Sequence, residues 1–524
     1  MKEGDDKAPL EVALEAISQK MRKLSDQPGL GSRSLGEPSL DAQLYQMGQS
    51  WLAANATEVT ASSDSICDVY LATRLYPYGG HTALIGDFVQ ALAAPGVESH
   101  LIVTNVLDAD PTLHLTENVQ SRTGITAEKT FILSGSAYED RLQQLFKHLL
   151  TLKPQRLFLF HHPHDPLPVV VCQPQIAPQR ILVHHADSVP SFGLFSPGIK
   201  IIDLNPMASA VTRFLDLKSN LLLLTSPDPG TRSAGFLTRD GLVTATSGST
   251  AKYQRIHSYS YPDTVAVILR TTGGWHYHVG HLGSKMLQEI NQVLLRKNLP
   301  TSRFIHIAWT PSISGFLWEQ ACDLYLSSFP VDGARTNAEV LASSTPHLRY
   351  TQRPEKELVG SGSAIPGGLT WSTHENLARV LEEVRDRSQL EKLSQQMRLA
   401  YEKVHHPKVF AETLQRILEG TVIPEEAEPE RDKRALRFLL KTVIHTSQAS
   451  WLALNTPAKP VVNTDLKPDR RLVAAINKQR ERIDFLQEQR KRLEQKLAKM
   501  ESENEQRGKG RGLRARLWRW LTQP

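Results

Sequence analysis

The hydrophobic pattern from residue 66 to residue 420 alternates between short apolar runs and longer amphipathic stretches. In the first half of this region, the apolar runs predict strands at 67–73, 99–104, 130–133, 156–160, 179–183 and 200–204. The amphipathic stretches between them predict helices, the clearest at 83–93 and 137–152. Strands and helices in regular succession are typical of a parallel sheet with right-handed crossovers, so we expect a Rossmann-like α/β domain.

The second half repeats this plan after a join at about 212–240 that is rich in Pro, Gly and Ser. Its apolar runs predict strands at 241–245, 264–269, 303–307, 323–328 and 347–350. Its amphipathic stretches predict helices at 283–296, 314–321, 337–343, 374–385 and 389–404. The expected fold class is therefore α/β, with two Rossmann-like domains at about 61–215 and 235–420 that face each other across a cleft. Ligands of such folds bind at the carboxyl ends of the strands.

Helical patterns flank the two predicted domains. Residues 1–60 form an N-terminal extension with two helices around a Gly-, Ser- and Pro-rich break, and we expect it to pack on the body or to be partly mobile. Beyond residue 420, a helix is predicted at 430–455. Apolar residues spaced alternately by three and four predict a coiled coil at 470–505, with a solitary solvated helix as the alternative. A coiled coil would join a homo-oligomer or a partner protein.

Composition and cysteine usage indicate a soluble globular protein. Hydrophobic residues make up 40% of the chain and charged residues 22%, which are ordinary values. The three cysteines (Cys67, Cys172 and Cys322) lie far apart with no CxxC motif, so neither a disulfide framework nor a zinc site is implied. No apolar run reaches the ~18 residues of a membrane span, and the start of the chain does not read as a signal peptide. We therefore expect a cytoplasmic setting.

The net charge of +6 is concentrated at the C-terminus. Six Arg and Lys residues and no acid occur in residues 507–524, and they account for the whole excess. The rest of the chain is close to neutral, which argues against nucleic-acid binding. Leu and Trp opposite Arg in this basic amphipathic tail favour an interfacial helix on anionic lipid, at the inner membrane face. A disordered basic tail is the alternative, and RNA binding is a lesser one.

A strand, loop and helix at 323–346 make the clearest candidate site. The loop after the predicted strand contains Gly333, and the helix begins with Arg335, Thr336 and Asn337. Unpaired N–H groups, a guanidinium and a hydroxyl at the carboxyl end of a strand suit a phosphate. Glu339, one turn into the helix, would accept a hydrogen bond from a sugar hydroxyl or pair with Arg335. An ordinary capped helix is the alternative for the whole segment.

Two further loops follow predicted strands. Lys252 follows the small-residue turn 246–251, where its ammonium group would reach a diphosphate as a point charge. An ordinary surface lysine is the alternative. Gly79 and Gly80 would let a ligand approach the backbone closely. His81 after them could take a proton near neutral pH, or be structural.

Histidines cluster at 161–165 and 184–187. Imidazoles and carboxylates together invite a metal hypothesis, but this loop spacing lacks the pattern of known metal sites. We therefore favour a role for His162, His185 and Asp187 in binding polar hydroxyls or shaping the cleft, and we predict no metal site.

The two Rossmann-like halves resemble the GT-B fold of nucleotide-sugar glycosyltransferases. Within that fold, residues 66–420 resemble the family that contains O-GlcNAc transferase and related bacterial protein glycosyltransferases. That family has a diphosphate-binding lysine after a strand and a small polar loop, so the resemblance gives this role to Lys252. It also implies that Thr336 binds the diphosphate, that Glu339 holds the ribose, and that His81 is the base. Part of the His185–Asp187 segment also looks like a motif of bacterial members.

The sequence departs from this family at Arg335, where threonine is usual, and at Ser344, which replaces a glycine. These changes put the identity of the nucleotide sugar in doubt. The sequence shows no tetratricopeptide repeats before the predicted domains, so we expect the family's usual acceptor-recognition arm to be absent.

The resemblance implies a metal-independent glycosyltransferase without a cofactor. It would move a hexosyl or N-acetylhexosaminyl group from a nucleotide-diphosphate donor, with a UDP-sugar expected, to a hydroxyl of a protein, a surface glycan or a lipid-linked acceptor. Two alternatives stay open: a nucleotide-sugar epimerase of the same shape, and a non-catalytic scaffold that acts through its coiled coil.

Overall fold

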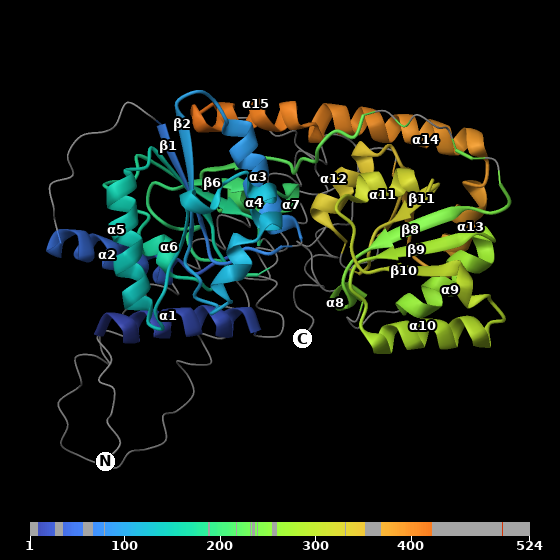
Figure 1. Ribbon diagram of the computed structural model, residues 1–524, viewed down its shortest axis with the longest axis horizontal. Helices are drawn as coiled ribbons and strands as arrows, with labels where there is room; N and C mark the ends of the chain where they lie inside the picture. Colours follow the sequence, from blue (N-terminus) through green and yellow to red (C-terminus); the bar gives the residue numbers. More distant parts are fainter. Residues whose placement is uncertain are drawn as a thin grey trace, which may run out of the picture.

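A computed structural model of the chain contains two parallel β-sheets, each covered by helices on both faces (Figure 1). The expected α/β fold with two Rossmann-like halves is therefore confirmed. The structure describes residues 9–26, 35–55, 66–77, 79–186, 189–215, 217–230, 232, 236–237, 239–253, 259–330, 332–351, 368–421 and 495.

The first sheet has seven parallel strands in the order β3-β2-β1-β4-β5-β6-β7. Their bounds are β1 (Ile66–Ala72), β2 (Val97–Val103), β3 (Thr130–Ile132), β4 (Arg156–Phe160), β5 (Gln179–His184), β6 (Lys200–Asp203) and β7 (Ser219–Leu221). The helices between them are α3 (Gly80–Leu92), α4 (Glu117–Thr123), α5 (Tyr138–Leu152), α6 (Leu167–Val170) and α7 (Pro206–Phe214).

Strand β1 lies at the centre of the first domain and is buried on both faces. Val69 and Leu71 belong to the apolar core on one side of the sheet, whereas Tyr70 and Ala72 belong to the core on the other. Successive side chains of a strand point to opposite faces, so a strand between two helical layers is apolar throughout. This explains why β1 was visible in the sequence as an apolar run. Asp68 interrupts the run, and its buried carboxylate pairs with Arg156 of β4.

The second sheet has six parallel strands in the equivalent order, β10-β9-β8-β11-β12-β13. Their bounds are β8 (Val243–Ser247), β9 (Trp275–Val279), β10 (Phe304–Ile307), β11 (Leu324–Leu326), β12 (His347–Tyr350) and β13 (Leu369–Trp371). The helices are α8 (Thr250–Tyr253), α9 (Tyr261–Thr272), α10 (Ser284–Arg296), α11 (Ile313–Glu319), α12 (Ala334–Ala342), α13 (His374–Glu383) and α14 (Arg387–Ala400).

One predicted strand is wrong. The apolar, β-branched run at 264–269 lies inside helix α9. The Ser260 hydroxyl caps this helix by accepting a hydrogen bond from the Asp263 backbone N–H, and Pro262 occupies its first turn. In the second sheet, β9 lies between β10 and β8. The sequence pattern did not predict β9, β7 or β13.

The N-terminal extension packs on the first domain. Leu14 and Met21 of α1 (Pro9–Asp26) and Leu44 of α2 (Pro38–Ala54) are buried in the core that also contains β1. Asp41 of α2 is fully buried, and its carboxylate accepts hydrogen bonds of 2.9 Å from the backbone N–H groups of Gly193 and Phe195. Of the two expectations for this extension, packing on the body holds for the helical segments 9–26 and 38–54.

The chain crosses back to the first domain at its described C-terminal end. Helix α14 lies on the second domain and leads through a π-helical turn (Tyr401–His405) into α15 (Pro407–Leu418), which lies over the first domain (Figure 1). Phe410 of α15 packs against Phe88 of α3, with ring centroids 5.4 Å apart. The predicted second domain at 235–420 did not anticipate this return.

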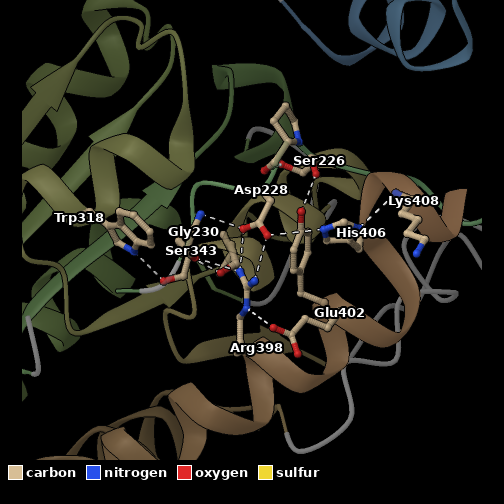
Figure 2. Close-up of polar contacts among 12 residues, drawn as sticks. Ser226, Asp228, Gly230, Trp318, Ser343, Arg398, Glu402, His406 and Lys408 are labelled. Carbon is tan, nitrogen blue, oxygen red and sulfur yellow. Dashed lines mark hydrogen bonds and ion pairs between the residues drawn. The ribbon is translucent and has the colours of Figure 1, made fainter. Parts of the chain in front are cut away.

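The two chain segments that connect the domains are held together by polar contacts (Figure 2). Asp228 of the first connection receives hydrogen bonds of 2.7 and 2.9 Å from Arg398, at the end of α14. The Tyr401 hydroxyl donates to the carbonyl of Ser226 at 2.9 Å, and His406 lies 3.6 Å from the Asp228 carboxylate. We call the segments 222–230 and 398–406 the hinge.

Three predicted C-terminal features lie outside the described residues, apart from residue 495: the helix at 430–455, the coiled coil at 470–505 and the basic tail at 507–524. In the part of the chain that is described, no helix combines the length and apolar character needed to cross a membrane.

Candidate functional site

The order of the strands marks where each sheet offers a ligand site. In the first sheet the order reverses between β1 and β4, and in the second between β8 and β11. The crevice outside the carboxyl ends of strands at such a reversal is the usual ligand site of open α/β sheets. The loops that leave these strands contain most of the predicted site residues. They hold Gly79–His81 after β1, His162 after β4, Lys252 after β8 and Gly333–Thr336 after β11.

Lys252 lies on α8, on the side of the second domain that faces the first (Figure 1). Its Nζ lies 3.5 Å from the Ser328 hydroxyl, and none of the described carboxylates lies within ion-pair distance of it. Burial lowers the pKa of Lys252, and the negative charge of Asp332 opposes this shift. A partly buried ammonium group without a paired carboxylate is a favourable position for an anion.

The N-terminus of α12 opens beside the Lys252 ammonium group. Gly333 is the N-cap and provides no side-chain capping bond, so the first N–H groups of the helix lack intrahelical partners. A Cβ added to Gly333 would lie 3.3 Å from Lys252 Nζ and 3.0 Å from Thr336 Oγ1, so the three groups surround one small space. We call Lys252 Nζ, Thr336 Oγ1 and these N–H groups the anion cradle, because each of them favours a negative charge.

Asn337, also predicted to bind phosphate, has its side chain in the core. It is 2% exposed, and its Oδ1 accepts a hydrogen bond of 3.4 Å from the Ser327 hydroxyl. The Asn337 side chain therefore joins α12 to the loop after β11.

Arg335 reaches across to the first domain. Its two terminal nitrogens donate to the carboxylate of Asp87 on α3, one of them at 3.1 Å. The side chains are only 14% and 9% exposed, so the ion pair is largely removed from water. Gly80 lies beside this ion pair, since a Cβ there would be in ordinary contact with the Arg335 Cβ, at 3.6 Å. The charge of Arg335 is thus compensated by Asp87, and the start of α12 is held against the start of α3.

Glu339 and Arg122 complete a group of four charges with this ion pair. Glu339 Oε1 lies 3.9 Å from Arg335 Nε, and its other oxygen accepts a hydrogen bond of 3.0 Å from the backbone N–H of Ile313. Burial raises the pKa of Glu339, and the Arg335 charge opposes that effect. Of the two roles considered for Glu339, pairing with Arg335 is the one seen in this structure.

His81 begins α3 and has a defined tautomer. Its Nε2 lies 2.9 Å from the carbonyl oxygen of Phe160, and a carbonyl only accepts, so Nε2 carries the proton. Nδ1 keeps its lone pair and has no hydrogen-bond partner among the described residues. Burial lowers the pKa of His81. The ring is therefore neutral near pH 7, which is the form that acts as a general base.

His185 lies next to His81, with ring centroids 4.6 Å apart. Its Nδ1 donates to the carbonyl of Val183 at 3.1 Å, and burial holds its pKa well below the usual value. Burial also lowers the pKa of His162, whose charge would be felt by His81. The structure thus gathers Gly79, Gly80, His81, His162 and His185 at one end of the first sheet. Asp187 lies outside the described residues.

Over the described ranges, no three His, Cys, Asp or Glu side chains converge in a way that could hold a metal ion.

Two charged residues of the site were missed by sequence reasoning. Asp87 is the sole carboxylate within α3, and an acid on a largely apolar helix was a usable signal. Arg122 of α4 donates to the carbonyl of Gly79 at 2.6 Å, which fixes the glycine loop, and nothing in the sequence distinguishes it from a surface arginine.

Two Rossmann-like sheets that place loops with these groups opposite each other define the GT-B fold of the glycosyltransferases, as the resemblance implied. By sequence, no family model matches the chain and no curated protein matches it.

The structural likeness rests on solved glycosyltransferases of low sequence identity. A variant of S. aureus TarM, in complex with fondaparinux, α-GlcNAc-glycerol and UDP, matches with a TM-score of 0.52 and 8% identity, over 67% of this chain and 99% of that one. A glycosyltransferase from Rickettsia africae matches with a TM-score of 0.50 and 10% identity, over 68% and 99%. A variant of the Thermobaculum terrenum O-GlcNAc transferase has a TM-score of 0.47 and 12% identity, over 81% and 78%. At these identities the likeness concerns the fold.

Proposed function

We propose that this protein is a glycosyltransferase that moves a sugar from a nucleoside diphosphate donor, with a UDP-sugar as the first candidate, to an acceptor hydroxyl. The observation that carries the proposal is the anion cradle at the strand-order reversal of the second sheet. An ammonium group with no ion-pair partner in the described part of the chain, a hydroxyl and an open helix N-terminus around one small space suit a diphosphate. The GT-B fold supports the same conclusion, because the S. aureus TarM variant was solved with UDP.

On the donor side, the bond between the anomeric carbon and the diphosphate oxygen breaks, and its electron pair leaves with the diphosphate. Lys252, Thr336 and the first N–H groups of α12 stabilise the charge that develops there. These groups are fixed before the reaction, so the proposed mechanism does not require a metal ion. Arg335 contributes by holding α12 in place through Asp87, and Glu339 supports Arg335 from the next turn.

On the acceptor side, the Nδ1 lone pair of His81 takes the proton of the acceptor hydroxyl as its oxygen attacks the anomeric carbon. The proposed reaction is an inverting one, in which the acceptor oxygen attacks the face of the anomeric carbon opposite the departing diphosphate. Gly79 and Gly80 let the acceptor approach the backbone, and His162 and His185 line the same end of the sheet.

The donor proposal is tested by thermal denaturation of the full chain with UDP-, GDP-, CMP- and dTDP-sugars. We expect a UDP-sugar to raise the midpoint, because a ligand that binds only the folded state stabilises it. Lys252→Ala should remove the shift. Gly333→Ala should do so as well, since its φ of −98° allows alanine while the new Cβ enters the cradle. If no nucleotide sugar shifts the wild-type midpoint, the proposal fails.

A non-catalytic GT-B scaffold is the second candidate. It is favoured by one observation, namely that the charge of Arg335 is already compensated by Asp87. An assay of UDP release with and without candidate acceptors distinguishes the two. Binding of UDP-sugar without release under any condition would favour the scaffold, and release that does not depend on acceptor would point to hydrolysis or epimerisation.

For the segments beyond residue 421, the proposal rests on the sequence alone. We propose that the coiled coil at 470–505 joins two copies or a partner protein, and that the basic tail at 507–524 places the enzyme on anionic lipid near glycan or lipid-linked acceptors. Deletion of 507–524 should release the protein from the membrane fraction. An unchanged membrane fraction would contradict the lipid-binding role.

A further inference from the structure

A chain of hydrogen bonds runs through the second domain to the loop in front of Lys252. The hydroxyl of Tyr261, at the start of α9, lies 2.6 Å from Nδ1 of His278 on β9. The other ring nitrogen of His278 lies 2.9 Å from the carbonyl oxygen of Gly248, which follows β8. Tyr261 and His278 are 2% and 0% exposed, so water does not compete for these bonds.

The direction of each bond follows from the chemistry of the partners. The Gly248 carbonyl only accepts, so Nε2 of His278 carries the proton and donates it. Nδ1 then has a lone pair and accepts from the Tyr261 hydroxyl. This tautomer satisfies both nitrogens of a neutral, buried ring. Burial lowers the pKa of His278 to about 3, so the ring keeps this state over the physiological range.

The Gly248 loop is packed tightly between β9 and Lys252. The Gly248 N–H donates to the carbonyl of Val279 at 2.9 Å, and a Cβ on Gly280 would lie only 2.5 Å from the Gly248 carbonyl oxygen. A Cβ on Gly248 would lie 3.1 Å from Cδ of Lys252. The position of Gly248 therefore decides where the stem of Lys252 runs, and hence where its ammonium group stands.

We propose that His278 is a positioning residue for the anion cradle, which it serves by fixing the Gly248 carbonyl so that Lys252 is directed towards Gly333. This inference rests on the proposed function, which supplies the nucleoside diphosphate as the ligand. Its geometry comes from the hydrogen bonds described above. His278 itself bonds to Tyr261 and Gly248, and its effect on the diphosphate passes through Lys252.

His276 provides a matched control on the same strand. It is also 0% exposed, and its Nδ1 shares a hydrogen bond of 2.8 Å with the Thr244 hydroxyl. Among the described residues no hydrogen bond joins it to the Gly248 loop, and its Nε2 lies 3.4 Å from the Tyr261 hydroxyl. Replacing either histidine by leucine removes a buried imidazole from β9, but only replacement of His278 frees the Gly248 carbonyl.

The experiment compares His278→Leu, His278→Gln and His276→Leu in two measurements. The first is hydrogen–deuterium exchange of residues 247–253 in the ligand-free full chain, where backbone N–H groups of Gly248, Thr250 and Lys252 are hydrogen-bonded. The second is the dissociation constant for UDP, measured by calorimetry. Thermal midpoints are recorded to verify that all three variants fold.

We expect His278→Leu to speed exchange in this segment and to weaken UDP binding about three- to tenfold, the effect of one lost hydrogen bond and a displaced charge. His278→Gln keeps an N–H donor at similar reach and should restore both values. His276→Leu should leave both at the wild-type level even if its midpoint falls.

Unchanged exchange in His278→Leu, or equal changes in His276→Leu, would overturn the positioning role. Failure of wild-type protein to bind UDP would instead count against the proposed donor, while the exchange result still decides the role of His278.

Discussion

At the level of single residues, the buried ion pair between Asp87 and Arg335 joins the two domains. It joins positions 248 residues apart in the sequence and places a carboxylate of α3 at the N-terminus of α12. Because both side chains are largely buried, removing Asp87 leaves Arg335 with only the longer contact of 3.9 Å to Glu339. Arg335 therefore matters to the cradle through the position of α12.

We expect Asp87→Ala to lower the free energy of unfolding by about 2–4 kcal/mol, since it leaves a largely buried guanidinium group with only the longer contact to Glu339. The charge-reversed pair, Asp87→Arg with Arg335→Asp, should recover part of this loss. Urea denaturation measures both. Glu383→Ala is the control, because the Arg379–Glu383 pair is 66% and 55% exposed and should contribute less than about 1 kcal/mol. Equal effects of the two alanine variants would contradict this account.

The buried histidines of the first domain predict a pH dependence. Burial lowers the pKa of His161 to about 4, below the ~6.5 of an unfolded histidine. The unfolded chain therefore binds this proton first, so stability from His161 is complete above pH 6.5 and is lost as the pH falls towards 4.

For His161→Gln, we expect the urea midpoint to fall less between pH 7 and pH 4.5 than in the wild type, by an amount equivalent to about 2 kcal/mol. Asp41 should change the pH dependence of the stability in the opposite direction. Burial raises its pKa to about 7, so its stabilising contribution is lost as the pH rises through 7, and Asp41→Asn should flatten that side of the profile. A His161 variant with the wild-type slope would show that another group titrates.

At the scale of elements, the sequence predicted most strands because both sheets are covered on both faces, so that their strands contain apolar runs. Strand β9 was missed because its sequence, Trp275–Val279, contains two histidines that look polar. In the folded chain, His276 and His278 are satisfied by buried hydroxyl groups, so they belong to the core. Partners of this kind come from other elements and cannot be read from a local pattern.

Helix α9 was missed for a related reason. Its β-branched run has a strand-like composition, whereas its start signals, Ser260 and Pro262, lie outside the run. Capping and packing outweigh intrinsic preference in this segment.

We expect Ser260→Ala to lower the free energy of unfolding by about 1 kcal/mol, because it removes the hydroxyl that accepts from the Asp263 N–H. Ser284→Ala, in the first turn of α10, is the control, since α10 has no side-chain capping bond. The denaturant midpoints of the two variants measure and compare these effects. A Ser284→Ala effect as large as that of Ser260→Ala would argue against a capping role.

The candidate site also contains both residues that the sequence predicted and residues that it did not. Lys252, Gly333 and Thr336 were predicted from local motifs at strand ends, because the carboxyl ends of parallel strands meet at one edge of a sheet. The structure brings these three together. Asp87, Arg122 and His278 act through contacts between distant segments. The acid on the apolar helix α3 was a signal for Asp87, but the sequence pattern does not show the partner of any of the three.

At the scale of the whole molecule, the hinge connects the domains at two points. Asp228 receives two hydrogen bonds from Arg398, which also bonds Glu402 at 2.6 Å, so one arginine ties the first connection to the second (Figure 2). This arrangement limits independent motion of the two segments.

We expect Asp228→Ala to free the first connection from Arg398 and to broaden the distribution of domain orientations. Small-angle X-ray scattering should show a larger radius of gyration, and the free energy of unfolding should fall by about 1–2 kcal/mol. Glu412→Ala on α15 is the control, because its pair with Lys408 is 64% and 78% exposed and touches no connection. An unchanged scattering profile for Asp228→Ala would show that other contacts set the orientation.

The return of α15 to the first domain has a consequence for synthesis on the ribosome. The core between β1 and α3 includes Phe410, Leu414 and Ile417, which are translated only after the entire second domain. The nascent first domain therefore emerges with Phe88 packed on Phe158 and Phe160 but without its contact to Phe410, and it waits for its last helix while the second domain forms. Chaperone binding to this apolar surface should depend on how quickly the ribosome completes the intervening sheet.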